Sequence, residues 1–285
     1  MIKRSLQFLA VAAATYYLVV SIVVHYFLAE LVFKTPPRTE THEDSLVTVA
    51  HNGNEVLIRR YNAINTQNNA CAIYFPGRHG GIPRYEKEIF GHANALGITI
   101  YALSLPGYEG AKGVSTEQSV IATTREALEH IEQNTPCNLS DAVFVGRSLG
   151  SSIALLNAIS FKPKAILLDS TGPSLATTIR TTLHKSLLGK PATLLPIEKL
   201  LQFDLPMISM IKQLEDTPIV IFQGALDSLT PYDDIATAVA GHNNVTLIKI
   251  FDATHNDVHI KARPLYLEQL TTLIGKNKSL ARATL

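Results

Sequence analysis

Gly146-Arg147-Ser148-Leu149-Gly150 is the stretch of this sequence that decides the fold. It follows an apolar run, residues 142–145, and precedes residues 151–160, which have the composition of a helix. A serine between a strand and a helix, with a glycine two residues away on either side, is typical of a sharp turn that exposes a nucleophilic hydroxyl. The glycines let the strand and the helix approach closely, where a Cβ atom would clash. We expect Ser148 to be a nucleophile; the alternative is an ordinary turn in which Ser148 caps the helix.

Length and charge restrict the class of protein. The chain has 285 residues, which is enough for one large α/β domain or two small ones. Its net charge is +1 at pH 7 and it contains no block of like charges, so nucleic acid is not an expected partner. Nothing in the sequence indicates the oligomeric state.

The N-terminal segment is almost wholly apolar from Leu6 to Phe33. A membrane span needs about 20 apolar residues, whereas the apolar region of a secretory signal is only about 7–15 residues long. We therefore expect residues 1–34 to form an uncleaved membrane anchor, followed by a polar linker over residues 35–45. The alternatives are a long cleaved signal peptide and an amphipathic helix that lies on the membrane.

Basic residues lie on both sides of this apolar run and determine its orientation poorly. Lys3 and Arg4 precede it, while Lys34 and Arg38 follow it. Because the N-terminal tail is short, we take a cytoplasmic N-terminus as the default. The protein is then a single-pass membrane protein whose catalytic domain lies outside the cytoplasm.

The rest of the chain, residues 46–285, alternates between strand and helix patterns, which predicts one α/β domain with a mostly parallel sheet. An antiparallel hairpin should open it, because Asn52-Gly53 separates two alternating runs. The expected strands are 46–50, 55–61, 71–75, 98–103, 142–145, 165–168, 218–223 and 245–250. The expected helices are 84–96, 115–133, 149–160, 233–240 and 264–274. Residues 171–217, between the sixth and seventh strands, break the alternation and read as a small cap or lid over the site.

The partners of a serine nucleophile should follow later strands, since sites in such sheets lie at the carboxyl ends of the strands. Asp227 follows the strand 218–223, and His255 follows the strand 245–250. A hydroxyl needs a base, and the base needs an acid that holds its tautomer. Ser148, Asp227 and His255 are therefore the predicted catalytic residues. Rival acids and a rival base remain: Asp169, Asp252, Asp257 and His259.

An oxyanion hole requires two backbone N–H groups. We expect one from Leu149, directly after the nucleophile, and the second from Arg78 in the glycine-containing loop 75–81. A plain glycine turn is the alternative for that loop. The side chains of Arg78 and Arg147 could place positive charge at the mouth of the site, but we expect them to be solvated.

Several pieces between about Leu46 and Ile274 resemble the membrane-anchored serine hydrolases of the α/β-hydrolase superfamily, in the branch of the protein depalmitoylases and their bacterial relatives. Those pieces are residues 74–78 (YFPGR), 103–110 (LSLPGYEG), 146–150 (GRSLG), 223–227 (QGALD) and 253–257 (ATHND). This chain has Pro76-Gly77 where relatives usually carry His-Gly, which bears on the second oxyanion donor, and Pro106 where they usually carry a polar residue.

The resemblance implies an α/β-hydrolase fold, in which helices flank the central sheet, and hydrolysis of an ester or thioester through a Ser148 acyl-enzyme. It implies no metal and no organic cofactor. The anchor suggests a lipid-linked or membrane-proximal substrate. Two other functions stay open: a serine peptidase on the same fold, and a non-catalytic binding protein on a hydrolase scaffold.

Cys71 opens one expected strand and Cys137 lies just before another, and the two strands would be parallel neighbours in this fold, so both thiols start from the same end of the sheet. A disulfide is one outcome in an oxidising compartment. We expect instead two unrelated buried thiols.

Overall fold

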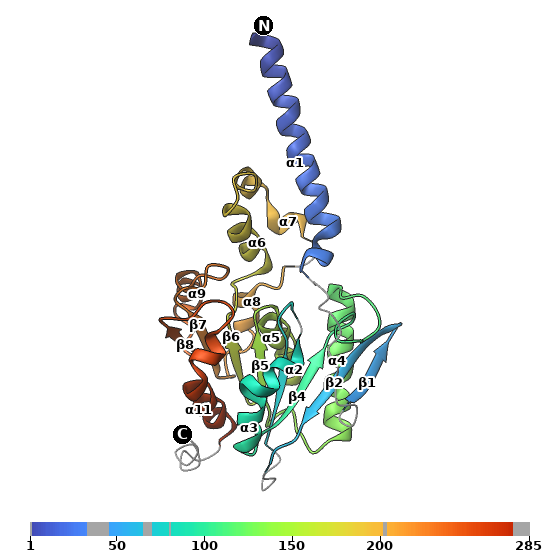
Figure 1. Ribbon diagram of the computed structural model, residues 1–285, viewed down its shortest axis with the longest axis vertical. Coiled ribbons are helices and arrows are strands. Elements are labelled where there is room, and N and C mark those ends of the chain that lie inside the picture. Colours follow the sequence, from blue (N-terminus) through green and yellow to red (C-terminus); the bar gives the residue numbers. More distant parts are fainter. Residues whose placement is uncertain (1, 33–45, 65–69, 80, 202–203, 276–285) are drawn as a thin grey trace.

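The structure, a computed structural model, describes residues 2–32, 46–64, 70–79, 81–201 and 204–275, and these residues form one eight-stranded sheet with helices on both faces (Figure 1). The strand order is β1-β2-β4-β3-β5-β6-β7-β8. The strands are β1 (Leu46–His51), β2 (Asn54–Tyr61), β3 (Cys71–Phe75), β4 (Thr99–Ser104), β5 (Val143–Arg147), β6 (Ala165–Asp169), β7 (Ile219–Gly224) and β8 (Val245–Ile250).

The mostly parallel sheet predicted from the alternation is confirmed. β1 pairs antiparallel with β2, and β2 antiparallel with β4, while the neighbours from β4 to β8 are parallel. Asn52 and Gly53 both have positive φ, as the opening hairpin requires. Every residue of β3, β5, β6 and β7 is buried, because helices cover both faces of these central strands.

Two apolar cores lie on the two faces of the sheet. One core includes side chains from α4 (Glu117–Asn134), α5 (Leu149–Phe161), α8 (Met207–Ile211) and α9 (Tyr232–Val239). The other includes side chains from α2 (Ile82–Tyr85), η2 (Glu86–Phe90), α3 (Gly91–Ala95), α10 (Val258–Lys261) and α11 (Arg263–Ile274). The sheet is thus held rigidly between two packed layers, which fixes the positions of its strand ends.

The prediction of one regular helix over residues 84–96 is wrong. The chain forms α2, then a π-helical segment η2, then α3. The apolar spacing of this region fits an unbroken helix. The structure instead has a wider helical turn over Glu86–Phe90, and Ile89 and Phe90 of this turn pack into the second core. Such π segments are frequent at functional sites, and η2 carries Glu88, which contacts the network described below.

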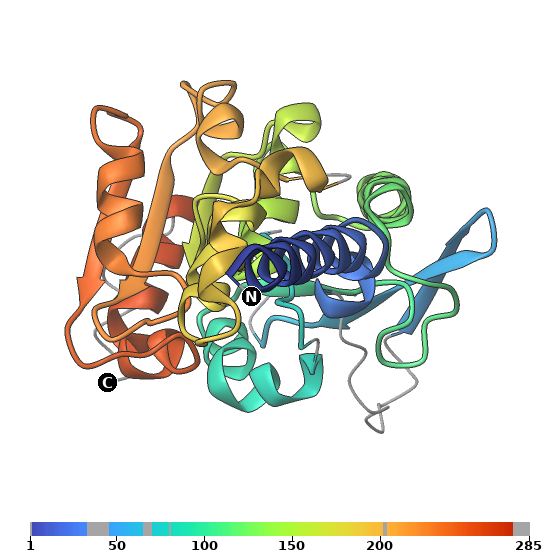
Figure 2. The same ribbon diagram turned by 90° about the horizontal axis from the view of Figure 1, so that it is seen from above.

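Residues 171–217, called the cap segment below, leave the sheet after β6 and return at β7. They include α6 (Leu175–His184), η3 (Lys190–Leu194), α7 (Ile197–Leu200) and α8. In Figures 1 and 2, α6 and α7 stand beside the N-terminal helix α1 (Ile2–Val32), on the side of the molecule where the parallel strands end.

Helix α1 is long and apolar enough over Lys3–Tyr26 to cross a membrane, a property that anchors share with N-terminal signal sequences. It projects away from the sheet (Figure 1). Its lower part is attached to the rest of the chain: Val24 is buried in the first core, and His25 Nδ1 lies 2.9 Å from the carbonyl oxygen of Leu200. The predicted linker, residues 35–45, lies outside the described residues.

The expectation of two unrelated thiols is wrong, because Cys71 and Cys137 form a disulfide. β3 and β5 are adjacent and parallel, with Ala72 opposite Val143. The two cysteines therefore meet at the amino ends of these strands, with their Cα atoms 5.8 Å apart. Both are 2% exposed, so the bond is shielded from solvent.

We predict that the two cysteines of the unreduced protein resist alkylation even after denaturation, and that both react after reduction. Because the bond closes a loop with a sequence separation of 66 residues, its loss should lower the free energy of unfolding by about 4 kcal/mol. Mass spectrometry after alkylation checks the first statement, and urea unfolding of the Cys71→Ser/Cys137→Ser variant checks the second. Two alkylated thiols in the unreduced protein would contradict the pairing.

Candidate active site

Ser148 occupies a strained turn between β5 and α5. Its φ is 52° and its ψ is −119°, a backbone conformation that an L-residue rarely adopts. Its N–H donates to the Asp169 carbonyl at 2.8 Å. A Cβ on Gly146 would lie 2.6 Å from the Gly150 carbonyl oxygen, and one on Gly150 only 2.0 Å from that of Phe75. The two glycines are therefore required by the close approach of α5 to the strand ends.

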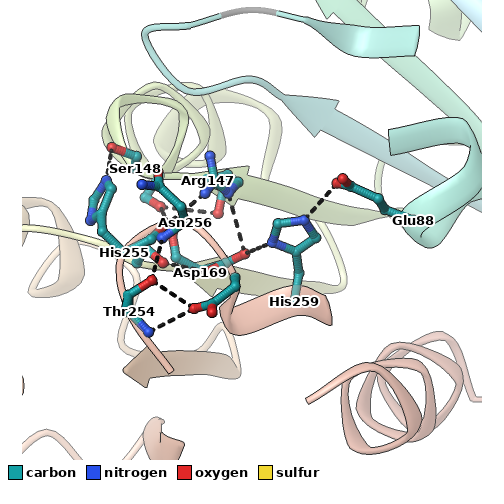
Figure 3. A network of polar contacts seen from close by, with 12 residues as sticks. Glu88, Arg147, Ser148, Asp169, Thr254, His255, Asn256 and His259 are labelled. Carbon is teal, nitrogen blue, oxygen red and sulfur yellow. Dashed lines mark hydrogen bonds and ion pairs between the residues drawn. The ribbon is translucent and has the colours of Figure 1, made fainter. Parts of the chain in front are cut away.

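The side chain of Ser148 faces His255 and does not cap the helix that it precedes. It makes no capping hydrogen bond, and its Oγ lies 3.0 Å from His255 Nε2. On the other side of the ring, His255 Nδ1 lies 2.8 Å from Asp227 Oδ2. The structure thus brings together the three residues predicted from the sequence, each from the carboxyl end of a different strand. Figure 3 shows Ser148 and His255 in this contact.

Asp227 is held as an ionised acceptor. Its Oδ1 accepts from the N–H groups of Leu229 and Thr230 at 2.9 and 2.8 Å. Its Oδ2 accepts from Thr230 Oγ1 at 2.7 Å and from Gln223 Nε2 at 3.0 Å. Burial opposes the charged form, but the hydrogen bonds from His255 and Thr230 outweigh it and hold the pKa of Asp227 below its ordinary value. A carboxylate that stays charged favours the His255 tautomer with its proton on Nδ1, which leaves Nε2 free to accept the Ser148 proton.

The rival acids and the rival base have other partners. Asp252 and Asp257 make ion-pair contacts with Lys261, and Asp257 also accepts from the Thr254 N–H and hydroxyl. Asp169 contacts His259 and Arg147 rather than His255. The ring of His259 is buried and lies between Asp169 and Glu88.

The loop after β3 passes directly beside Ser148. A Cβ on Gly77 would lie 3.4 Å from Ser148 Cβ and 3.2 Å from the Arg147 carbonyl oxygen, so the backbone of Gly77 is in van der Waals reach of the turn. The buried Tyr108 hydroxyl donates to the carbonyl of Arg78 at 2.9 Å and holds the next residue in place. Leu149 is the first residue of α5. The two predicted oxyanion donors therefore lie near Ser148. Leu149 follows Ser148 directly in the chain, and Arg78 follows Gly77, whose backbone lies beside Ser148.

Arg147 is not solvated, contrary to expectation. Only 5% of the residue is exposed, because the turn directs its guanidinium inward. Its Nη2 donates to the carbonyl oxygen of His255 at 2.9 Å, and its Nε lies 3.6 Å from Asp169 Oδ2. The side chain thereby ties the backbone of the predicted base to the strand that carries the predicted nucleophile.

A network of polar side chains continues from Arg147, with Asp169 and His259 buried and Glu88 half-buried (Figure 3). His259 Nδ1 lies 3.3 Å from Asp169 Oδ2, and His259 Nε2 lies 2.8 Å from Glu88 Oε2. Burial would raise the pKa of Asp169, but His259, Arg147 and the Ser170 hydroxyl outweigh burial and lower it. This network makes no contact with Ser148 Oγ, and its location behind the turn suits a role in holding the turn and the His255 loop together.

Sequence reasoning missed Thr230, Gln223 and the network of Arg147, Asp169, His259 and Glu88. Gln223 carried a weak signal, since a polar residue ending an otherwise apolar strand needs a partner. Glu88 and His259 are far apart in the sequence and carried none. Among the described residues, no group of three or more His, Cys, Asp or Glu side chains is arranged to hold a metal ion.

We predict strong coupling between Arg147 and Asp169 in stability. Arg147→Met leaves a buried carboxylate without its cation and should lower the free energy of unfolding by about 3 kcal/mol. Asp169→Asn in the same background should restore part of that loss. Urea unfolding of both single variants and the double variant measures the coupling, with Arg125→Met, which removes an exposed arginine paired with Glu129, as the matched control. Additive effects within about 0.5 kcal/mol would contradict the coupling.

Comparison with known proteins agrees with this arrangement at the level of the fold. No family model matches the chain. An uncharacterized protein of Mycobacterium tuberculosis is 27% identical over 138 residues, or 48% of this chain and 46% of that protein, so the match spans about half the length of the relative. The α/β-hydrolase domain-containing protein WAV2 of Arabidopsis thaliana is 24% identical over 209 residues, or 68% of this chain and 66% of that protein.

Solved structures superpose over most of the chain. An α/β-hydrolase from Vibrio vulnificus has a TM-score of 0.68 at 17% identity and covers 87% of this chain and 92% of its own. Est1E of Butyrivibrio proteoclasticus, solved with ferulic acid bound, has a TM-score of 0.61 at 15% identity and covers 81% of this chain and 100% of its own. A thioesterase domain from the curacin biosynthetic pathway has a TM-score of 0.56 at 14% identity and covers 80% of this chain and 98% of its own. The strand order, the turn at Ser148 and these superpositions together show that the protein is an α/β-hydrolase-fold protein.

Proposed function

We propose that this protein is a serine hydrolase that cleaves carboxylic ester or thioester bonds through a covalent acyl-enzyme on Ser148. One observation carries the proposal: an unbroken chain of contacts runs from Ser148 Oγ through both nitrogens of His255 to the buried carboxylate of Asp227, at 3.0 and 2.8 Å. A nucleophile, a base and an orienting acid in this geometry are what acyl transfer by a serine requires.

The first half of the reaction acylates Ser148. Its Oγ attacks the acyl carbonyl carbon while His255 Nε2 takes the hydroxyl proton, and Asp227 stabilises the imidazolium that results. The N–H groups of Leu149 and Arg78 hold the oxyanion of the tetrahedral intermediate. When this intermediate collapses, the bond to the leaving alcohol or thiol breaks and the leaving group receives the proton from Nε2.

The second half releases the acyl group. A water molecule gives a proton to His255 Nε2 and attacks the acyl carbon, and the same two N–H groups hold the second oxyanion. Collapse of that intermediate releases the carboxylic acid and returns the proton to Ser148. The five hydrogen bonds to Asp227 from backbone and side-chain donors support this cycle because they keep its charge and position fixed while His255 changes protonation state.

The choice of ester or thioester rests on the neighbours of the fold. Est1E and an esterase of Pyrococcus furiosus, with TM-scores of 0.61 and 0.62, and the thioesterase domain with a TM-score of 0.56, support a carbonyl with an oxygen or sulfur leaving group. The resemblance to depalmitoylases favours an acyl chain attached to a membrane-proximal molecule.

Helix α1 and the disulfide both bear on the cellular location. We propose that α1 anchors the protein in a membrane and that the catalytic domain lies outside the cytoplasm. The length and composition of Lys3–Tyr26 support the anchor. The buried Cys71–Cys137 bond supports an oxidising compartment for the domain, since cytosolic disulfides are rare.

We predict that a fluorophosphonate probe labels the wild-type protein and that Ser148→Ala abolishes the labelling, because His255 lies beside the Ser148 hydroxyl and can take its proton. Gel fluorescence or mass spectrometry measures it. Ser209→Ala, which removes an exposed serine whose hydroxyl donates only to the nearby Pro206 carbonyl, is the matched control and should be labelled like the wild type. A folded wild type that stays unlabelled would favour a non-catalytic binding protein.

We also predict that p-nitrophenyl acyl esters and the corresponding thioesters are hydrolysed faster than anilides with the same acyl group. Oxygen and sulfur leaving groups depart with less help than an amine, which must be protonated by His255 as it leaves. Steady-state rates with matched acyl groups compare the classes, and Ser148→Ala supplies the background. Faster turnover of the amide would overturn the esterase proposal and make the protein a peptidase.

A further inference from the structure

We propose that the tip of the cap segment, residues 185–194, inserts into the same lipid bilayer as α1. This inference rests on the membrane anchoring proposed above. It concerns a different part of the chain, so it can fail while the proposed anchoring stands. We call residues 185–194 the cap tip.

The cap tip presents large apolar side chains to solvent. Leu187, Leu188 and Leu194 are 84%, 81% and 79% exposed, the highest values among the large hydrophobic residues described. Scattered single exposed leucines are ordinary on a protein surface. Here three of them project from one short segment between α6 and α7, which marks an interaction surface and not a random exposure.

The position of the cap tip relative to α1 identifies its partner. The Tyr16 hydroxyl donates to the carbonyl oxygen of Leu188, so Leu188 lies level with Tyr16 on the helix. Tyr16 is within the apolar span Lys3–Tyr26. It is ten residues before Tyr26, a distance of about 15 Å along a helix. A bilayer has a hydrocarbon core about 30 Å thick, so one that surrounds Lys3–Tyr26 must also meet Leu187 and Leu188.

This arrangement is fixed at more than one point. His25 Nδ1 contacts the Leu200 carbonyl at 2.9 Å, and Val24 packs into the core that includes Ile197. Figure 1 shows α7 close beside α1, with α6 next to α7. Because α1 is attached to the cap segment near both ends of the contact, the bilayer cannot reach the helix and avoid the cap tip.

Charges around the cap tip match a lipid surface. Lys185 and Lys190 flank the leucine pair, and Lys185 Nζ donates to the Ser228 hydroxyl at 3.1 Å. Over residues 175–200 the sequence carries the cations Arg180, Lys185, Lys190 and Lys199 against the single acid Glu198, which pairs with Arg180. The lysines require the cap tip to lie at the edge of the bilayer nearest the rest of the domain, because a charged side chain can reach the headgroups only over its own length.

Membrane insertion of the cap tip would place the bilayer over the candidate active site. The cap segment starts directly after β6, and a Cβ on Gly172 would lie 3.1 Å from Thr230 Cγ2. Thr230 in turn holds Asp227. The base of the cap therefore lies against Thr230, the residue whose hydroxyl donates to Asp227, while its tip would reach the lipid.

The absence of tryptophan from the sequence allows a direct test. Leu188→Trp, Phe8→Trp and Ile64→Trp each introduce one fluorophore at a position that is 81%, 75% or 70% exposed. Phe8 reports on α1. Ile64 follows β2 at the amino ends of the parallel strands, away from the cap, and is the matched control. The full-length protein is reconstituted in phosphatidylcholine and phosphatidylglycerol vesicles, with and without brominated acyl chains.

We expect blue-shifted emission and loss of most fluorescence to the brominated lipid for Leu188→Trp and Phe8→Trp, and neither effect for Ile64→Trp. Leu187→Trp repeats the test if Leu188→Trp folds poorly. Quenching of Phe8→Trp without quenching at either leucine position would overturn the inference and leave the anchor intact. Quenching at none of the positions would overturn both the cap-tip inference and the proposed anchoring by α1. Probe labelling of Ser148 would still test the hydrolase proposal separately. A concentration-dependent blue shift of Leu188→Trp without vesicles would show that a second copy of the chain covers the cap tip, and would also overturn the inference.

Discussion

The rest of the structure depends on the close contact between β3, β5 and α5 at Ser148. A residue with φ of 52° links a buried strand to a helix whose backbone nearly touches the end of β3. Only glycines at positions 146 and 150 permit this approach. The strain is tolerated because two packed cores fix the strand on both faces. The result is a hydroxyl raised above the sheet at the point where the loops after β7 and β8 deliver Asp227 and His255.

The polar side chains behind this turn connect the Ser148 turn to the His255 loop. The His255 loop follows the edge strand β8, and the Ser148 turn follows the central strand β5, so nothing in the sheet ladder joins them directly. The hydrogen bond from Arg147 to the His255 carbonyl provides such a link. Burying a guanidinium is costly unless it is paired, and Asp169, itself contacted by His259, supplies the pairing. Arg147, the neighbour of Ser148 in sequence, thus holds His255 in position from behind.

The cap segment and α1 form the surroundings of the candidate site. Both lie on the side where the parallel strands end, and they contact one another through Tyr16 and His25. An anchored enzyme with its cap at the lipid surface would meet acyl chains without releasing them into water. The departures from the related motifs, Pro76-Gly77 and Pro106, lie in the loops after β3 and β4 on this side, and Tyr108 joins these two loops through the Arg78 carbonyl.

By itself, the sequence determined the local elements and the identity of the three side chains that the structure brings together at the candidate site. Alternating apolar runs, the Asn52-Gly53 turn and the glycines around Ser148 act over a few residues, so the parallel sheet and the three residues Ser148, Asp227 and His255 were predictable from spacing and order. Tertiary structure alone decided the rest. The disulfide depends on β3 and β5 being neighbours, the π turn before α3 on packing against the second core, and the buried state of Arg147 on the direction of a strained turn. Glu88 and His259 meet across 171 positions, and the cap tip meets α1 across 172. Such contacts carry no local signal, because they are set by which surfaces remain to be buried once the sheet has formed.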